Sequence, residues 1–225
     1  MIDPSVQRLN MIESQIRPSD ITDQAILRAM GSVHREEFLS SERKALAYLD
    51  IDQPLVFPKQ NRASQRFLWA PRTFAKLLQL AAIQPTHRVL DVGCGTGYST
   101  AIMSKLSEEV VALETDSALA QVACDMVKAH KINNVRVLEG SLPEGCPKEA
   151  PFDIILLEGA VAQTPDKLLN QLKDGGRLVG ILRKGYSSRA YRWLRSGEVV
   201  SSHPEFDIPN AFILPGFEPK RGFVF

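Results

Sequence analysis

Apolar and polar positions along the middle of the chain follow two periods, one typical of strands and one typical of helices. Short apolar runs predict five strands, at residues 88–92, 110–114, 135–138, 152–157 and 177–182, and the run at 152–157 suits a strand buried on both faces. Apolar positions at helical spacing predict helices before and between these strands, at residues 72–83, 98–106, 117–130 and 166–172. Strands that alternate with helices in this order predict an α/β fold with a doubly wound, mostly parallel sheet.

The two ends of the chain carry other patterns. Apolar positions at helical spacing predict a lead-in of three helices, over residues 5–15, 22–30 and 36–48. Prolines then break any regular pattern over residues 50–71, which predicts an irregular loop. Beyond residue 183 we expect an antiparallel hairpin, from strands at 191–194 and 197–201, and an apolar tail that adds an edge strand. We expect one domain over residues 1–225, made of a lead-in and loop (1–71), a core (72–182) and C-terminal strands (183–225).

A glycine-rich turn joins the first predicted strand to the helix after it. Gly93, Gly95 and Gly97 stand at alternate positions after the acidic Asp91, and the helix pattern begins at Tyr98. Glycine permits a tight turn and leaves room for a ligand where a Cβ atom would stand. The free N–H groups of the first helical turn would face that ligand. A dinucleotide-binding loop would need glycine where Tyr98 stands, so this spacing argues against one.

The spacing resembles the first motif of the class I S-adenosylmethionine (SAM) methyltransferases. Such a site needs a second acidic residue at the end of the next strand, and Glu114 stands there. Its carboxylate could accept hydrogen bonds from both ribose hydroxyls. Cys94, inside the loop, is interpreted as a small packing residue. The alternative is a glycine loop that binds nothing.

Composition narrows the classes of function. The 225 residues are 44% hydrophobic and 24% charged with a net charge of +1, which favours neither nucleic acid nor an anionic membrane as a partner. No apolar run is long enough to span a bilayer, and no secretory signal is visible at the N-terminus. The three cysteines lack metal-site spacing. We therefore expect a cytoplasmic protein with reduced thiols and no metal.

Further residues resemble one family of these enzymes, the protein-L-isoaspartate (D-aspartate) O-methyltransferases. The resemblance lies in the lead-in, which reads MIESQIR, ITD, ILRAM and VHREEF over residues 11–38, and in PFDII and LLNQLKDGGRLV over residues 151–179. It implies a seven-stranded, Rossmann-like sheet and transfer of a methyl group from SAM to the α-carboxyl of isoaspartyl residues in damaged proteins. The cofactor residues that it implies are Asp91, Gly93, Cys94, Gly95, Gly97, Glu114, Glu139 and Gly140.

The sequence departs from the family pattern on the substrate side. A family loop of the type GQTISQP appears here as QRFLWAP, so that Phe67 and Trp69 replace hydroxyl residues and Ser64 is the nearest hydroxyl upstream. A threonine–alanine pair after the fourth strand appears as Glu158 and Gly159. Ser64, Trp69 and Glu158 are therefore the candidates for a catalytic role, and Glu158 is equally well explained as a solvated loop acid.

Basic residues near this loop could bind the acceptor. Arg62, Arg66 and Arg72 could clamp a carboxylate, and aromatic neighbours such as Trp69 suit a planar group. A solvated loop explains the same residues without a ligand. Two further functions stay open beside isoaspartyl methylation: methyl transfer to another acceptor, such as a small molecule, and a SAM-binding interaction protein without turnover. A monomer is expected.

Overall fold

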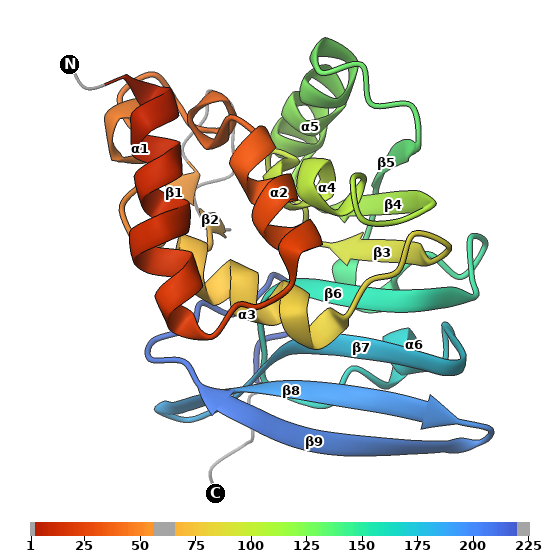
Figure 1. Cartoon of the computed structure of the whole chain (residues 1–225). Coiled ribbons are helices and arrows are strands. Elements are labelled where there is room, and N and C mark those ends of the chain that lie inside the picture. Colours follow the sequence, from red (N-terminus) through yellow and green to blue (C-terminus); the bar gives the residue numbers. More distant parts are fainter. Residues whose placement is uncertain (1–2, 56–65, 220–225) are drawn as a thin grey trace, which may run out of the picture.

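Seven strands form one sheet in a computed structural model of the chain, which describes residues 3–55 and 66–219. The strand order is β5-β4-β3-β6-β7-β8-β9, from top to bottom in Figure 1. The strands from β5 to β7 pair in parallel, and β8 and β9 extend the sheet antiparallel. The predicted α/β class is therefore confirmed. The bounds are β3 (Arg88–Val92), β4 (Glu109–Glu114), β5 (Val135–Glu139), β6 (Phe152–Val161), β7 (Leu172–Lys184), β8 (Ser187–Ser196) and β9 (Val199–Asp207).

Both faces of the sheet are covered, because successive side chains of the central strands enter different cores. On β6, Ile154 and Leu156 belong to one core and Ile155 and Leu157 to the other. The first core includes residues of five helices, α1 (Pro4–Met11), α2 (Gln24–Ser32), α3 (Pro71–Ala81), α4 (Tyr98–Met103) and α5 (Ser117–Ala129). The second includes the short α6 (Asp166–Leu169). The apolar runs at β3, β4 and β6 are thus strands buried on both sides, whereas the edge strand β5 is only half-buried.

The lead-in differs from its prediction at the third helix. Residues 36–48 form two short 3₁₀ turns, Arg35–Phe38 and Lys44–Leu46, in place of one helix. The side chain of Arg35 donates a 2.7 Å hydrogen bond to the Ala47 carbonyl. A straight helix would hold these two residues roughly 18 Å apart, so the chain folds back to make the bond.

The loop expected over residues 50–71 contains a small two-stranded sheet. β1 (Gln53–Leu55) pairs antiparallel with β2 (Arg66–Leu68). In Figure 1 both strands lie between the lead-in helices and the end of the sheet where β3 terminates. This end is where ligands bind in open α/β sheets, so the small sheet stands over the predicted cofactor loop.

The C-terminal tail was predicted wrongly as an edge strand. Ile213 makes one parallel bridge to Ala160 on β6, while β9 forms the edge of the sheet. The tail is drawn inward because the Leu214 amide donates a 2.8 Å hydrogen bond to the Ala160 carbonyl and the Leu214 side chain is fully buried. The tail therefore contributes to the same end of the sheet as β1 and β2.

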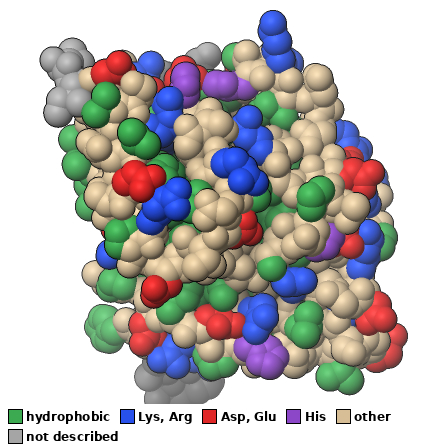
Figure 2. Space-filling view, in the orientation of Figure 1, with side chains coloured by type: hydrophobic (Ala, Val, Ile, Leu, Met, Phe, Trp, Pro, Cys, Tyr) green, Lys and Arg blue, Asp and Glu red, His purple; other side chains and the backbone are tan. Residues whose placement is uncertain are grey.

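The surface agrees with the near-neutral composition. Figure 2 shows basic and acidic side chains interspersed over the face that it presents. Among residues 3–55 and 66–219, no helix is both long and apolar enough to cross a membrane.

Candidate cofactor and acceptor site

The glycine loop after β3 has the backbone geometry that its spacing predicted. Gly93, Gly95 and Gly97 have φ angles of 84°, 58° and 90°, in the left-handed region that favours glycine. The Gly93 and Cys94 amides both donate to the Leu113 carbonyl on β4, at 2.7 and 3.1 Å. The loop is thereby held against the next strand, and α4 starts at once behind it.

Asp91 is fully buried at the end of β3, and only one of its two carboxylate oxygens accepts hydrogen bonds from the described residues. Its Oδ2 accepts hydrogen bonds from the Ser99 and Thr100 hydroxyls at 2.8 and 2.6 Å. Its Oδ1 has no hydrogen-bond partner among the described residues. Burial raises the pKa of this carboxyl to about 6, although the two hydroxyls oppose the shift. A buried oxygen without a partner is costly, and it suits a donor that comes from a ligand.

Glu114 ends β4 beside the loop and is also fully buried. Its Oε2 accepts the Gly95 amide at 2.8 Å, and its Oε1 accepts the Thr115 amide at 2.8 Å. Glu139 lies next to it, at the paired position on β5, and is exposed. The Gly140 amide donates to the Glu114 backbone carbonyl at 2.9 Å. The predicted acids and glycines of a cofactor site therefore meet at one corner of the sheet.

Arg66, on β2, has its side chain inside this corner. Its Nη1 lies 3.0 Å from Glu114 Oε1, and the two side chains are 1% and 0% exposed. Its Nη2 donates to the Gly93 carbonyl. A buried guanidinium and carboxylate attract each other strongly because little water screens them. The charge of Arg66 is therefore directed at the predicted ribose-binding acid.

Protein side chains fill the space directly above the glycines. A Cβ atom on Gly95 would lie 2.6 Å from Leu55 Cδ1, and one on Gly93 would lie 2.6 Å from Arg66 Nη2 and 3.0 Å from Leu214 Cδ2. The chemical groups at the corner fit SAM, with a free buried acceptor on Asp91, a carboxylate at Glu114 and a cradle without side chains. In this structure, the side chains of Leu55, Arg66 and Leu214 occupy part of the space above the glycines that SAM would need.

The predicted acceptor side consists of two aromatic side chains that pack on Phe212 and a buried acid, Glu158. Trp69 is 1% exposed, and its ring centroid lies 4.5 Å from that of Phe212 in the C-terminal tail. Phe67 packs against the same ring at 4.8 Å. Neither Trp69 Nε1 nor Glu158 Oε1 has a hydrogen-bond partner among the described residues. These two polar atoms could meet an acceptor.

Glu158 lies on β6, next to β3, where the strand order changes direction. Burial raises the pKa of its carboxyl well above the usual range, and the negative charge of Asp91 acts in the same sense. Arg66 and Arg35 act in the opposite sense. The neutral acid is thus favoured, and it can donate a hydrogen bond to an anionic acceptor. Glu158 is buried rather than a solvated loop acid.

Other predicted residues are placed differently. Arg72 is 57% exposed at the start of α3 and forms a 3.1 Å ion pair with Asp50, so its charge is used away from the buried corner. Cys94 is buried, and burial raises the pKa of its thiol well above the usual range, as suits a packing residue. Arg62 and Ser64 lie outside the described residues. Within those residues, no group of His, Cys, Asp and Glu could hold a metal.

Sequence reasoning missed the residues that close the corner. Leu55 and Leu214 are single apolar residues far apart in the chain, and no spacing marks them. Arg35 was also missed. It is fully buried, donates to the Trp69 carbonyl and lies 4.9 Å from the centre of the Tyr98 ring. It ties the lead-in to both Trp69 and α4.

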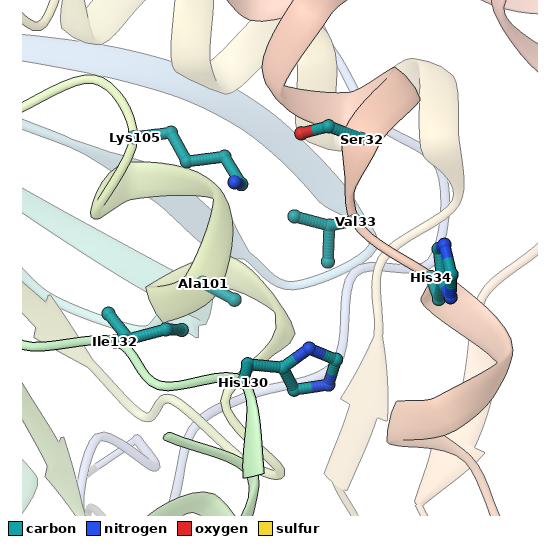
Figure 3. A pocket seen from close by; sticks show the side chains of 7 residues that line it. All are labelled: Ser32, Val33, His34, Ala101, Lys105, His130 and Ile132. Carbon is teal, nitrogen blue, oxygen red and sulfur yellow. The ribbon is translucent and has the colours of Figure 1, made fainter. Parts of the chain in front are cut away.

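A hollow of about 200 Å³ lies elsewhere on the molecule, between the ends of α2, α4 and α5. Figure 3 shows its lining, which includes His34, Lys105 and His130 and no residue of the glycine loop. Both histidines contact Glu37, at 3.2 and 2.9 Å. These contacts join the lead-in to α5 without reaching Asp91 or Glu114.

The chain is similar to known proteins over most of its length. Residues 6–203 match the family model described as protein-L-isoaspartate (D-aspartate) O-methyltransferase. A protein-L-isoaspartate O-methyltransferase from Koribacter versatilis is 37% identical over 175 residues, which are 78% of this chain and 76% of that one. Another from Protochlamydia amoebophila is 38% identical over 169 residues, 75% of this chain and 77% of that one.

Solved structures agree on the fold. One protein-L-isoaspartate O-methyltransferase superposes with a TM-score of 0.81 at 23% identity and covers 95% of this chain, which spans 66% of that one. The enzyme from Plasmodium falciparum, solved in complex with S-adenosyl-L-homocysteine (SAH), gives 0.76 at 21% identity over 92% of this chain and 97% of its own. The family match and these folds confirm the resemblance, and the chain belongs to the protein-L-isoaspartate (D-aspartate) O-methyltransferase family.

Proposed function

We propose that this chain transfers a methyl group from SAM to the α-carboxyl of isoaspartyl residues in damaged proteins. One observation carries the proposal: the acid, glycine loop and second acid of a SAM site meet at one buried corner of the sheet in a chain of this family. We further propose that it acts as a monomer in the cytoplasm.

The residues of the corner have separate roles in holding the cofactor. The glycine loop would leave room for its amino-acid part, and Asp91 Oδ1 would accept a hydrogen bond from it. Glu114 would accept the ribose hydroxyls, and Glu139, which is paired with Glu114 on the next strand, would contact the base. The bound cofactor would supply a methyl group already activated on a sulfonium.

The acceptor needs little chemical help. Its carboxylate is already nucleophilic, so the protein has to align it with the methyl group and exclude water. The buried Trp69 and the half-buried Phe67 would form an aromatic wall that excludes water from one side of the acceptor. Glu158, as a neutral acid, would donate a hydrogen bond to one acceptor oxygen and leave the other free to attack.

The test is transfer of labelled methyl from SAM to a synthetic isoaspartyl peptide, beside the same peptide with ordinary aspartate. The proposal expects label in the isoaspartyl peptide alone, released by mild base as an ester would be. A Glu114→Ala protein in parallel should transfer no label, because the ribose would lose its acceptor. Absence of transfer from a folded protein that binds SAH would overturn the choice of acceptor.

A second candidate function is methyl transfer to a planar small molecule. The rings of Trp69 and Phe67, which both pack against Phe212, favour it, since aromatic walls suit flat ligands. Incubation with labelled SAM and a set of aromatic hydroxy and carboxy compounds would test it. Label in a compound but in neither peptide would select this function.

A further inference from the structure

We propose that the guanidinium of Arg66 occupies the cofactor site of the resting chain and that SAM binds only by displacing it. The inference rests on the proposed cofactor site and adds an internal competitor to it. No methyl transfer is part of the inference, since it concerns binding alone.

The first argument is that Arg66 uses the same groups as the cofactor. It pairs with Glu114 Oε1 at 3.0 Å, the carboxylate that would take the ribose hydroxyls. It also donates to the carbonyl of Gly93, the first glycine of the loop. Glu114 Oε1 already accepts the Thr115 and Asp116 amides at 2.8 and 3.1 Å, so a ribose hydroxyl would have to take the place of the guanidinium.

The second argument is space. The Nη2 atom of Arg66 stands 2.6 Å from where a Cβ atom of Gly93 would be, although the glycine is there to leave room for a ligand. Leu55, on the neighbouring strand β1, stands equally close to Gly95. The cradle is therefore filled by two strands that pair with each other.

The third argument is that Arg66 does not use all of its hydrogen-bond donors in its buried position. Its Nε has no hydrogen-bond partner among the described residues, although the whole side chain is buried. Burying a charged group with an unmet donor costs free energy. Release to water recovers that cost, so displacement by a ligand with matching donors is feasible.

The expected effect follows from population shift. When a binding-competent state is a small fraction of the protein, the apparent affinity falls by that fraction. Removing Arg66 removes the competitor. Arg66→Ala should therefore bind SAH about tenfold more tightly than the wild type, or more. Arg66→Lys keeps a charge without the fork that matches a carboxylate and should lie between them.

Titration calorimetry with SAH is the first measurement. The control is Arg189→Ala, which removes an exposed arginine paired with Asp207 on β8 and β9, far from the glycine loop. The control should bind as the wild type does. If the wild type and Arg66→Ala bound SAH with equal affinity, the inference would be overturned, but the proposed cofactor site would not. Binding by none of the proteins would overturn the cofactor site itself, and the inference with it.

A second measurement uses the wild type, in case Arg66→Ala is poorly folded. The Nε–H proton of a buried arginine exchanges slowly with water and gives an NMR signal, which loss of the peak in Arg66→Lys would assign. Addition of SAH should weaken this signal as the side chain becomes solvated. A signal that is unchanged at saturating SAH would overturn the inference.

Discussion

The buried pair of Arg66 and Glu114 makes a quantitative prediction for stability. Both side chains are at most 1% exposed, and Glu114 also accepts the Gly95 and Thr115 amides. Removing one partner of such a pair leaves the other charge buried without compensation, which costs about 3–5 kcal/mol. We expect Glu114→Gln to lose about 3 kcal/mol of unfolding free energy, at the low end because glutamine keeps one acceptor oxygen.

A double-mutant cycle separates the pair from the other contacts. The double variant Glu114→Gln with Arg66→Met leaves neither charge buried without its partner. Its loss of unfolding free energy should therefore be smaller than the sum of the losses in the two single variants. The coupling should be about 2–3 kcal/mol, measured by urea unfolding with a constant slope. The exposed Arg189 and Asp207 pair is the control and should be close to additive. Additivity within about 0.5 kcal/mol at Arg66 and Glu114 would refute the buried pair.

Three further predictions concern ligand binding and activity. Gly95→Val should abolish SAH binding, because a Cβ atom is strained at a φ of 58° and would meet Leu55. The control is Gly185→Val, which has a similar φ of 60° but open space around it and should keep SAH binding; calorimetry on both variants is the test. Trp69→Ser should raise kcat/KM for the isoaspartyl peptide by restoring a small hydroxyl, and a fall with unchanged SAH affinity would instead show that the acceptor needs the indole ring itself. SAH affinity should fall about tenfold per pH unit below pH 6, as Asp91 takes up a proton and loses its acceptor, and Asp91→Asn should bind weakly with no such slope.

The central part of the fold and the glycine turn after β3 follow from local sequence. Short apolar runs predicted all five parallel strands, and alternate glycines between Asp91 and the helix at Tyr98 predicted the turn that the structure shows. Such signals are local because a strand buried on both faces needs a continuous apolar run, and a left-handed turn needs glycine.

The features that the sequence did not indicate depend on contacts between distant residues. The helix expected at 36–48 is broken because Arg35 bonds to Ala47 across a reversal of the chain. Arg66 was predicted as a residue that clamps the acceptor, and the structure places its charge on Glu114. The composition of the loop could not indicate this, since a guanidinium pairs equally well with a ligand or with a carboxylate of the same chain.

The most direct test of this account is a crystal structure of the chain grown with SAH. We predict SAH across Gly93–Gly97, its ribose hydroxyls on Glu114, and the Arg66 side chain withdrawn from that carboxylate. SAH bound at another place, with Arg66 still paired to Glu114, would contradict both the assigned cofactor site and its internal competitor.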